Sequence, residues 1–142
     1  MAQEMVQRIA FKAVILNDKN QVLMLQESGK GGQRGKGRYH FPGGRLELGE
    51  HWRDGLQREA HEEIGQNLEI FDPVFIGEWR PTINGVVNQI IGVFVRCFLR
   101  NPDQQVVISD EHMGYAWLDK NDWRAYDVMD PDDQVLAAVF RN

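Results

Sequence analysis

The chain has 142 residues, of which 42% are hydrophobic and 26% are charged. These values predict a single domain over residues 1–142 with an ordinary hydrophobic core, and they exclude disordered and fibrous proteins. Acidic residues outnumber basic ones by 21 to 16, which disfavours a stable complex with nucleic acid, because such proteins neutralise phosphates with lysine and arginine. Neither a signal peptide nor a run of about 18 apolar residues is present, so we expect a cytoplasmic protein that does not enter a membrane.

The first half of the chain predicts two strands, a loop and a helix. Residues 9–16 and 21–25 flank the turn formers NDKN and predict a β-hairpin. Residues 28–38 contain five glycines and four cationic side chains, which is typical of a surface loop. A proline-free stretch over residues 51–64 predicts a helix that ends at Gly65, since glycine readily adopts the left-handed conformation after a helix.

The second half predicts further antiparallel strands and a final helix. An Asp-Pro break and an Asn-Gly turn separate three apolar segments, at residues 68–71, 74–79 and 86–99. Residues 131–140 open with proline and two aspartates and predict a helix. This order of elements predicts an α+β fold, an α/β/α sandwich in which a mixed β-sheet lies between α-helices. Cys97 lies in an apolar run, and we interpret it as a small buried hydrophobe rather than a reactive thiol.

The helix predicted over residues 51–64 gathers three carboxylates beside its apolar side. At roughly 100° per residue, Glu63 lies about 40° to one side of Glu59 and Glu62 lies about 60° to the other. This acidic sector borders the stripe that should face the core, formed by Leu56, Ala60 and Ile64. Like charges at this spacing repel, and more strongly where burial lowers the dielectric constant. Clustered oxygen ligands therefore favour a hard cation such as Mg²⁺ or Mn²⁺.

A charged helix face is more often only solvated, but here glycine turns precede the acids at fixed spacing. Residues 44–66, GRLELGEHWRDGLQREAHEEIGQ, resemble the Nudix box, the pattern G-x5-E-x7-R-E-U-x-E-E-x-G-U in which U is aliphatic. The positions that match are Gly44, Glu50, Arg58, Glu59, Ala60, Glu62, Glu63 and Gly65. Gln66 departs from the pattern, and we interpret this as a change in the loop that leaves the site intact, with Leu68 supplying the packing.

The resemblance implies the Nudix fold and an enzyme that hydrolyses a phosphoanhydride bond in a nucleoside diphosphate linked to another group. In similar enzymes, water attacks phosphorus while metal ions offset the developing charge. A magnesium site is implied, with manganese as the alternative, and its ligands are the Gly44 carbonyl and the carboxylates of Glu59, Glu62 and Glu63. The resemblance makes Glu62 a candidate base as well, and it gives Arg58 the role of orienting the glutamates.

A second segment, EHMGYAWL at residues 111–118, resembles a stretch of Nudix hydrolases that act on diadenosine tetraphosphate and dihydroneopterin triphosphate. Glu111 is then a candidate metal ligand or base supplied from a loop. His112 is a candidate substrate contact, because GDP-mannose hydrolases use a histidine near this position. No functional role is assigned to His40, His51 or His61.

The substrate is a small-molecule nucleotide, and its identity is the least determined part of the prediction. Trp79 is a candidate to stack on a base and Arg80 to bind a phosphate. Pro81 resembles a proline of ADP-ribose pyrophosphatases, whereas residues 111–118 favour a nucleoside triphosphate or related polyphosphate, which we prefer. The alternatives are an ADP-ribose or nucleotide-sugar pyrophosphatase and a catalytically silent domain that senses nucleotides. An isoprenoid diphosphate isomerase needs a cysteine at its site, for which Cys97 is poorly placed. We expect a monomer or a homodimer.

Overall fold

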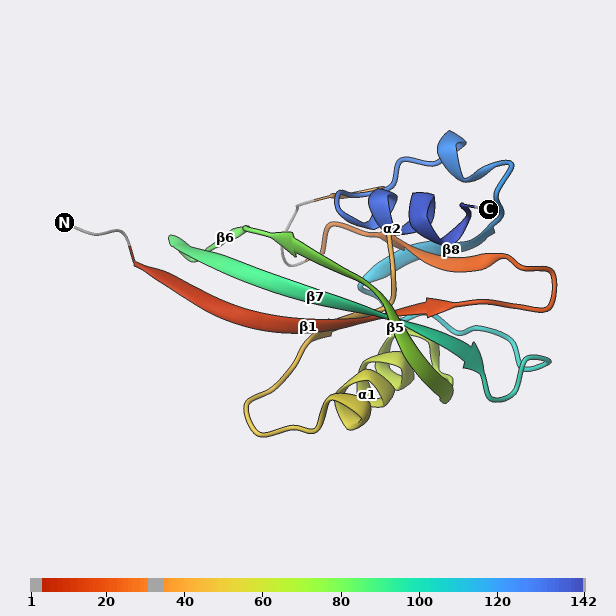
Figure 1. Ribbon diagram of the computed structural model, residues 1–142, viewed down its shortest axis with the longest axis horizontal. Coiled ribbons are helices and arrows are strands. Elements are labelled where there is room, and N and C mark those ends of the chain that lie inside the picture. Colours follow the sequence, from red (N-terminus) through yellow and green to blue (C-terminus); the bar gives the residue numbers. More distant parts are fainter. Residues whose placement is uncertain (1–3, 31–34, 142) are drawn as a thin grey trace.

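The structure, a computed structural model, describes residues 4–30 and 35–141. Strands dominate, with one helix in the middle of the chain and one at its end (Figure 1). The elements are β1 (Met5–Ile15), β2 (Val22–Glu27), β3 (Tyr39–His40), β4 (Gly43–Arg45), α1 (Trp52–Ile64), β5 (Leu68–Trp79), β6 (Thr82–Ile83), β7 (Val86–Leu99), β8 (His112–Leu118), the 3-10 turn η1 (Trp123–Ala125) and α2 (Asp132–Val139).

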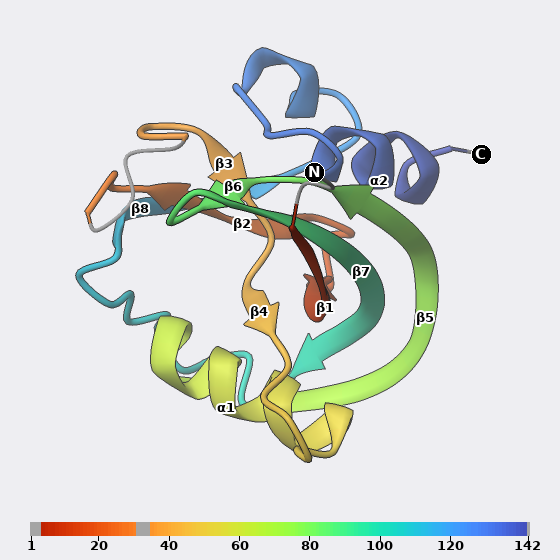
Figure 2. The ribbon, with the colours of Figure 1, turned by 90° about the vertical axis from the view of Figure 1, so that its left-hand side faces the viewer.

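The strands form two sheets. The larger sheet is mixed, with the order β4-β1-β7-β5 and with β6 paired to β7; β1 runs parallel to β7 and the other pairs are antiparallel. The smaller sheet is antiparallel, with the order β3-β2-β8. Helix α1 lies on one side of the sheets and α2 on the other (Figures 1 and 2). The predicted α+β sandwich is confirmed, with its strands divided between two sheets.

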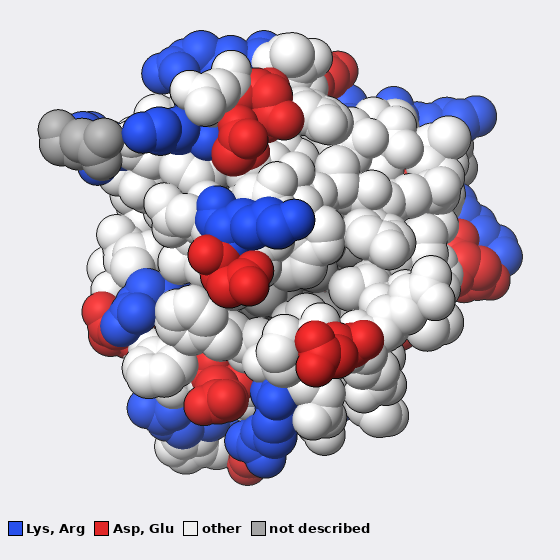
Figure 3. Space-filling view, turned by 90° about the vertical axis from the view of Figure 1, so that its right-hand side faces the viewer, with Lys and Arg blue, Asp and Glu red and all other residues white. Residues whose placement is uncertain are grey.

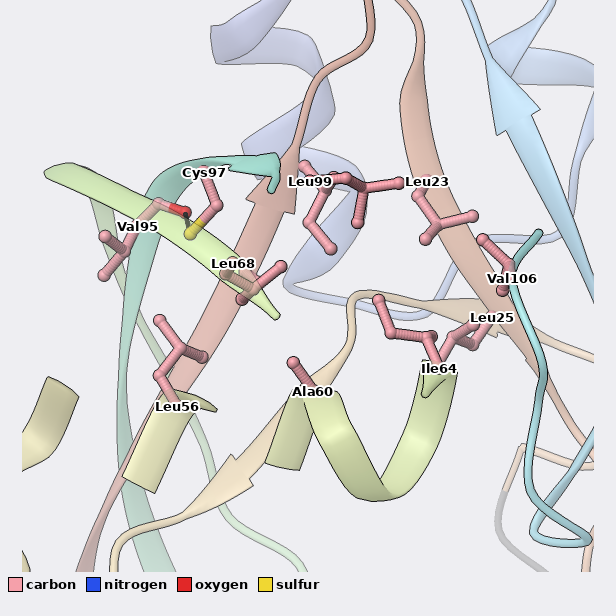
Figure 4. Close-up of a cluster of buried hydrophobic side chains, with 12 residues drawn as sticks. Leu23, Leu25, Leu56, Ala60, Ile64, Leu68, Val95, Cys97, Leu99 and Val106 are labelled. Atoms are coloured by element: carbon pink, nitrogen blue, oxygen red, sulfur yellow. Dashed lines mark hydrogen bonds between the residues drawn. The ribbon is translucent and has the colours of Figure 1, made fainter. Parts of the chain in front are cut away.

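Two hydrophobic clusters hold the layers together. One cluster lies under α1, where Leu56, Ala60 and Ile64 meet side chains of β1, β2, β5 and β7 (Figure 4). The other lies between the sheets and α2. Successive residues of β2 alternate between them, because Leu23 points to the first cluster and Met24 to the second. Strand side chains alternate in direction, so β2 is buried on both faces.

The predicted hairpin of residues 9–16 and 21–25 is wrong in its pairing. The turn forms, since the Asn17 N–H donates to the Gln21 carbonyl at 3.1 Å. Only the isolated bridge between Leu16 and Val22 joins the two segments, however, and they then enter different sheets. β1 pairs instead with β7 along its whole length, and β2 pairs with β8. β2 and the second half of β1 are largely buried on both faces, which suits positions between two cores better than a half-exposed hairpin.

The other predicted elements are found, with one change. The helix of residues 51–64 is α1, and Gly65 follows it in the left-handed conformation with φ 67°. The segments 68–71 and 74–79 form the single strand β5, where the Asp-Pro break is a bulge. A bulged proline is tolerated because β5 is an edge strand. Neither helix that the structure describes has the length and apolar character that crossing a membrane requires.

The surface carries mixed charge. The centre of the predicted glycine-rich loop, residues 31–34, lies outside the described residues. At the described ends of that loop, Lys30 pairs with Asp110 and Arg38 pairs with Asp127. On the face in Figure 3, basic and acidic side chains lie next to one another instead of forming a continuous basic patch.

We expect Cys97 to be unreactive in the folded protein. Its thiol is fully buried in the cluster under α1 and donates to the Val95 carbonyl at 3.4 Å, and burial raises its pKa to about 12. Because the thiolate is the reactive form, the native protein should not react with 5,5′-dithiobis(2-nitrobenzoic acid) at pH 8, and one thiol should appear on unfolding in denaturant. Rapid labelling of native protein would contradict the buried position.

Candidate active site

Arg58 is the cation at the centre of the carboxylates on α1. Its Nε and Nη2 donate to the two carboxylate oxygens of Glu50, at 2.8 and 3.0 Å. Its Nη1 lies 3.3 Å from Glu59 and 3.4 Å from Glu62. The bidentate pair holds the pKa of Glu50 below its usual range and keeps the guanidinium from rotating. The ion pair of Arg58 and Glu62 is therefore one arm of a larger network.

Glu63 and Glu59 are carboxylates withdrawn from water. Glu63 is 6% exposed and accepts the Gly43 N–H at 2.7 Å, and burial raises its pKa to about 8. Burial also raises the pKa of Glu59, more than Arg58 lowers it. A Cβ atom on Gly44 would lie 2.8 Å from the Glu59 carboxylate. Strand β4 thus brings its backbone against both acids, and beside Glu59 the approach is one that only glycine permits.

The end of α1 holds the segment that carries Glu111. The carbonyls of Glu63 and Ile64 accept the N–H groups of Ser109 and Val107, at 3.3 and 3.1 Å. Gln66 is buried and donates to the Gln104 carbonyl at 2.8 Å. The departure at Gln66 therefore fastens this loop, while Leu68 is buried in the core under α1. Glu111 is exposed, and its negative charge is the smallest of the causes that shift the pKa of Glu63.

A cavity of about 230 Å³ opens beside Trp79. The indole packs against Phe94, and Gly92 makes room for it, because a Cβ atom there would lie only 2.4 Å from the ring. The walls of the cavity combine apolar, acidic and basic groups: Lys12, Glu27, His40, Trp79, Pro81, Met129, Asp130, Pro131 and Asp132. A flat aromatic wall with a few polar groups around it suits a small heterocyclic ligand.

A second cavity, of about 390 Å³, lies at the start of α1. Arg8, Arg45 and Arg58 line it together with Glu47, Leu46 and Glu59. Arg80, the predicted phosphate contact, lines neither this cavity nor the one beside Trp79. It forms an exposed pair with Glu78 at 2.7 Å instead. The arginines that the fold places beside the carboxylates are therefore Arg8 and Arg45.

Of the four histidines, His51 and His61 lie on or beside α1, and His40 and His112 contact each other. His51 caps α1 by accepting the Arg53 N–H at 3.2 Å, and His61 is exposed on that helix. His112 is buried, and burial lowers its pKa to about 4. Its Nε2 lies 3.0 Å from Nε2 of His40 and 4.0 Å from Glu63. His40 thus belongs to the site region, although its sequence context gave it no role.

Two more buried polar residues, Lys12 and Asp132, and the half-buried Glu27 escaped the sequence analysis. Lys12 is 9% exposed and its charge lowers the pKa values of Glu63, Glu59 and Asp132. Asp132 accepts the Phe41 N–H at 2.9 Å, and its pKa is raised by burial. Glu27 ends β2 beside His40. The one sign of these residues in the sequence was Lys12, a lysine inside the apolar run of residues 9–16. Burying a lysine without a partner costs free energy, so its position calls for acidic neighbours.

The matches with known proteins agree with this geometry. The model of the NUDIX domain matches residues 6–139. The chain belongs to the Nudix family. A nucleoside triphosphatase, NudI, of Salmonella arizonae is 26% identical over 100 residues, which cover 65% of this chain and 69% of that protein.

Solved structures share the fold. A MutT protein from Methanosarcina mazei Go1 superposes with a TM-score of 0.79 at 21% identity, covering 95% of this chain and 93% of that one. The dihydroneopterin triphosphate pyrophosphohydrolase of E. coli superposes with a TM-score of 0.70 at 23% identity, covering 92% and 94%. At such identities these likenesses establish the architecture.

We expect Glu63 to make the metal-free protein less stable as the pH rises. Its folded-state pKa of about 8 exceeds the ordinary 4.5, so the folded protein holds this proton more tightly, and the stabilisation is lost as pH rises toward 8. His112 acts in the opposite direction, but only below its ordinary pKa of 6.5. Between pH 6.5 and 8 the free energy of unfolding should fall by about 2 kcal/mol.

Urea unfolding in the presence of a chelator measures this slope. Glu63→Gln should remove it, because the amide stays neutral and can still accept the Gly43 N–H. An identical slope in wild type and variant would contradict the buried, protonated carboxyl.

Proposed function

We propose that this member of the Nudix family is a magnesium-dependent hydrolase that cuts a phosphoanhydride bond in a nucleoside triphosphate or a related nucleoside polyphosphate. The observation that carries the proposal is the set of carboxylates of α1, held by one arginine and closed on one side by Gly43 and Gly44 of β4. The family match over residues 6–139 supports treating the chain as one domain. The relatedness to a nucleoside triphosphatase supports the choice of substrate.

The donor set fits a hard divalent cation. Glu59 and Glu63 have pKa values raised by burial, so their ionised forms need a counter-charge that Arg58, already engaged with Glu50, supplies only in part. Carboxylate and carbonyl oxygens are the ligands that Mg²⁺ prefers. We assign the metal to the Gly44 carbonyl and to the carboxylates of Glu59, Glu62, Glu63 and Glu111. When bound, Mg²⁺ offsets the charge of the phosphate oxygens.

The protein's own groups then position substrate and water. Arg58 fixes Glu59 and Glu62 on one face of α1, and we propose it as a positioning residue. Glu62 is the most exposed of the three helix carboxylates, with 57% of its side chain accessible, and with Glu111 it is a candidate base. We propose that Arg8 and Arg45, which line the cavity at Glu59, bind phosphate oxygens in place of Arg80, which lines neither cavity.

Nucleoside binding is assigned to the cavity beside Trp79. The indole offers a stacking surface for a base, and Pro81 lies on the same wall, so ADP-ribose and nucleotide sugars remain alternative substrates. His112 reaches this cavity only through His40. Cys97 is excluded as the catalytic cysteine of an isomerase, because its thiol is buried in the core under α1.

We expect purified protein with Mg²⁺ to release phosphate or pyrophosphate from a nucleotide in a panel of triphosphates, dinucleoside polyphosphates, ADP-ribose and nucleotide sugars. Glu62→Gln and Glu63→Gln should each lower kcat by about 100-fold or more, since they remove a ligand or a base. Glu69→Gln, which neutralises an exposed carboxylate on β5, is the matched control. Resolved products would identify the attacked phosphorus.

Two outcomes would count against the proposal. Full activity in both glutamine variants would remove the carboxylates from the mechanism. Tight nucleotide binding without hydrolysis across the panel would instead favour the domain that senses nucleotides.

A further inference from the structure

The smaller sheet carries three side chains of metal-binding types, one glutamate and two histidines, on one face. In the β2–β8 register, Glu27 lies opposite His112, and in the β2–β3 register Leu25 lies opposite His40. Residues two apart on a strand share a face, so Leu25 and Glu27, and with them both histidines, point to the same side. A bulge between Gln26 and Glu27 alters the direction of the last side chain.

The donor atoms of these residues converge at the spacing of a small coordination shell. Nε2 of His40 lies 3.0 Å from Nε2 of His112 and 3.5 Å from Oε2 of Glu27. All three donor atoms lie within 4.8 Å of one another. Zinc bonds of about 2.0–2.2 Å in a tetrahedron separate neighbouring ligand atoms by about 3.3–3.6 Å. The distance of 3.5 Å between His40 and Glu27 lies within this range, and the distance of 3.0 Å between the two histidines is shorter than its lower limit. The histidine side chains would therefore need to move by only a few tenths of an ångström to bind the ion.

His40 turns Nδ1 toward the backbone and Nε2 toward His112 and Glu27. Its Nδ1 lies 2.9 Å from the Phe41 carbonyl, an acceptor that requires the proton on Nδ1. A backbone carbonyl on the second ring nitrogen is a common support for a metal-binding histidine. Lys12 lies 3.4 Å from this same Nδ1, on the nitrogen that points away from the other donors. A hydrogen bond between the two imidazoles would explain their contact, but it would not explain why Glu27 approaches the same nitrogen of His40.

We propose that Glu27, His40 and His112 form a second cation site, for a transition metal such as zinc, separate from the carboxylate site on α1. Imidazole nitrogens favour such ions, whereas the all-oxygen set on α1 favours magnesium. The two sites adjoin, because Glu63 of the carboxylate site lies 4.0 Å from His112.

Three protein ligands leave a fourth position open. Glu27 and His40 line the cavity beside Trp79, so the open position faces that cavity and a ligand held there. This last step rests on the proposed function, under which the cavity holds the nucleoside end of the substrate. Cation binding itself does not depend on it.

Titration with Co²⁺ in excess Mg²⁺ tests the site, because Co²⁺ at a tetrahedral nitrogen-containing site absorbs visible light and Mg²⁺ occupies the oxygen ligands. Wild-type protein should bind one equivalent with this spectrum. Glu27→Gln and His40→Gln should each weaken binding by at least about 10-fold. His61→Gln, which changes an exposed histidine of α1, is the matched control and should bind as wild type does.

A Glu59→Gln variant separates this proposal from the proposed function. It should lose hydrolysis and keep the cobalt spectrum, whereas an inactive wild type that binds cobalt would overturn the proposed function alone. Equal cobalt affinity in Glu27→Gln and wild type, or no cobalt spectrum in wild type, would overturn the second site.

Anomalous diffraction from cobalt-soaked crystals of the wild-type protein tests the same site, and its result does not depend on whether a variant folds. A peak between the Nε2 atoms of His40 and His112 supports the site, and a peak only at Glu59 and Glu63 overturns it.

Discussion

Negative charge held against the apolar core is the constraint on which the site depends. Glu63 is buried and accepts the Gly43 N–H, next to side chains that pack the core under α1. Glu59 lies one helical turn before it. Arg58 is divided among Glu50, Glu59 and Glu62, so it cannot neutralise all of them. The carboxylates therefore keep their protons or acquire a cation. The glycines before α1 matter for the same reason, since side chains there would occupy the space beside the acids.

The division of the strands into two sheets gives the protein two donor sets of different chemistry. Helix α1 presents oxygens at the end of the larger sheet, while the smaller sheet presents two imidazoles and a carboxylate on one face. The segment that follows β7 is fastened to the end of α1 by Gln66 before it becomes β8. That connection brings His112 within 4.0 Å of Glu63. The two donor sets are adjacent because the segment between β7 and β8 is hydrogen-bonded to the end of α1.

Local signals in the sequence sufficed for α1 and its carboxylates. The helical period, the glycine after the helix and the spacing of the box all lie within residues 44–66, so no distant contact had to be known. The hairpin prediction failed for the opposite reason. Its turn is local and forms, but the partner of β1 is β7, whose residues lie about 80 positions further along the chain.

The histidine cluster escaped prediction on the same grounds. His40 and His112 are 72 positions apart, and strand register, which brings them together with Glu27, cannot be read from either segment alone. Trp79 and Arg80 are neighbours in the sequence, yet Trp79 lines the cavity while Arg80 pairs with Glu78 at the surface. Lys12 was visible as a charge in an apolar strand, yet its acidic neighbours come from α1 and α2.

The effect of Mg²⁺ on thermal unfolding tests the central claim, that the carboxylates of α1 require a divalent cation, most directly. At pH 8 the unfolding midpoint of wild type should rise and saturate with Mg²⁺, because a ligand at 100 times its Kd stabilises the folded state by about 2.7 kcal/mol. In Glu59→Gln, with one ligand removed and the remaining charge reduced, most of this rise should disappear. An equal rise in both proteins, or none in wild type, would contradict the account.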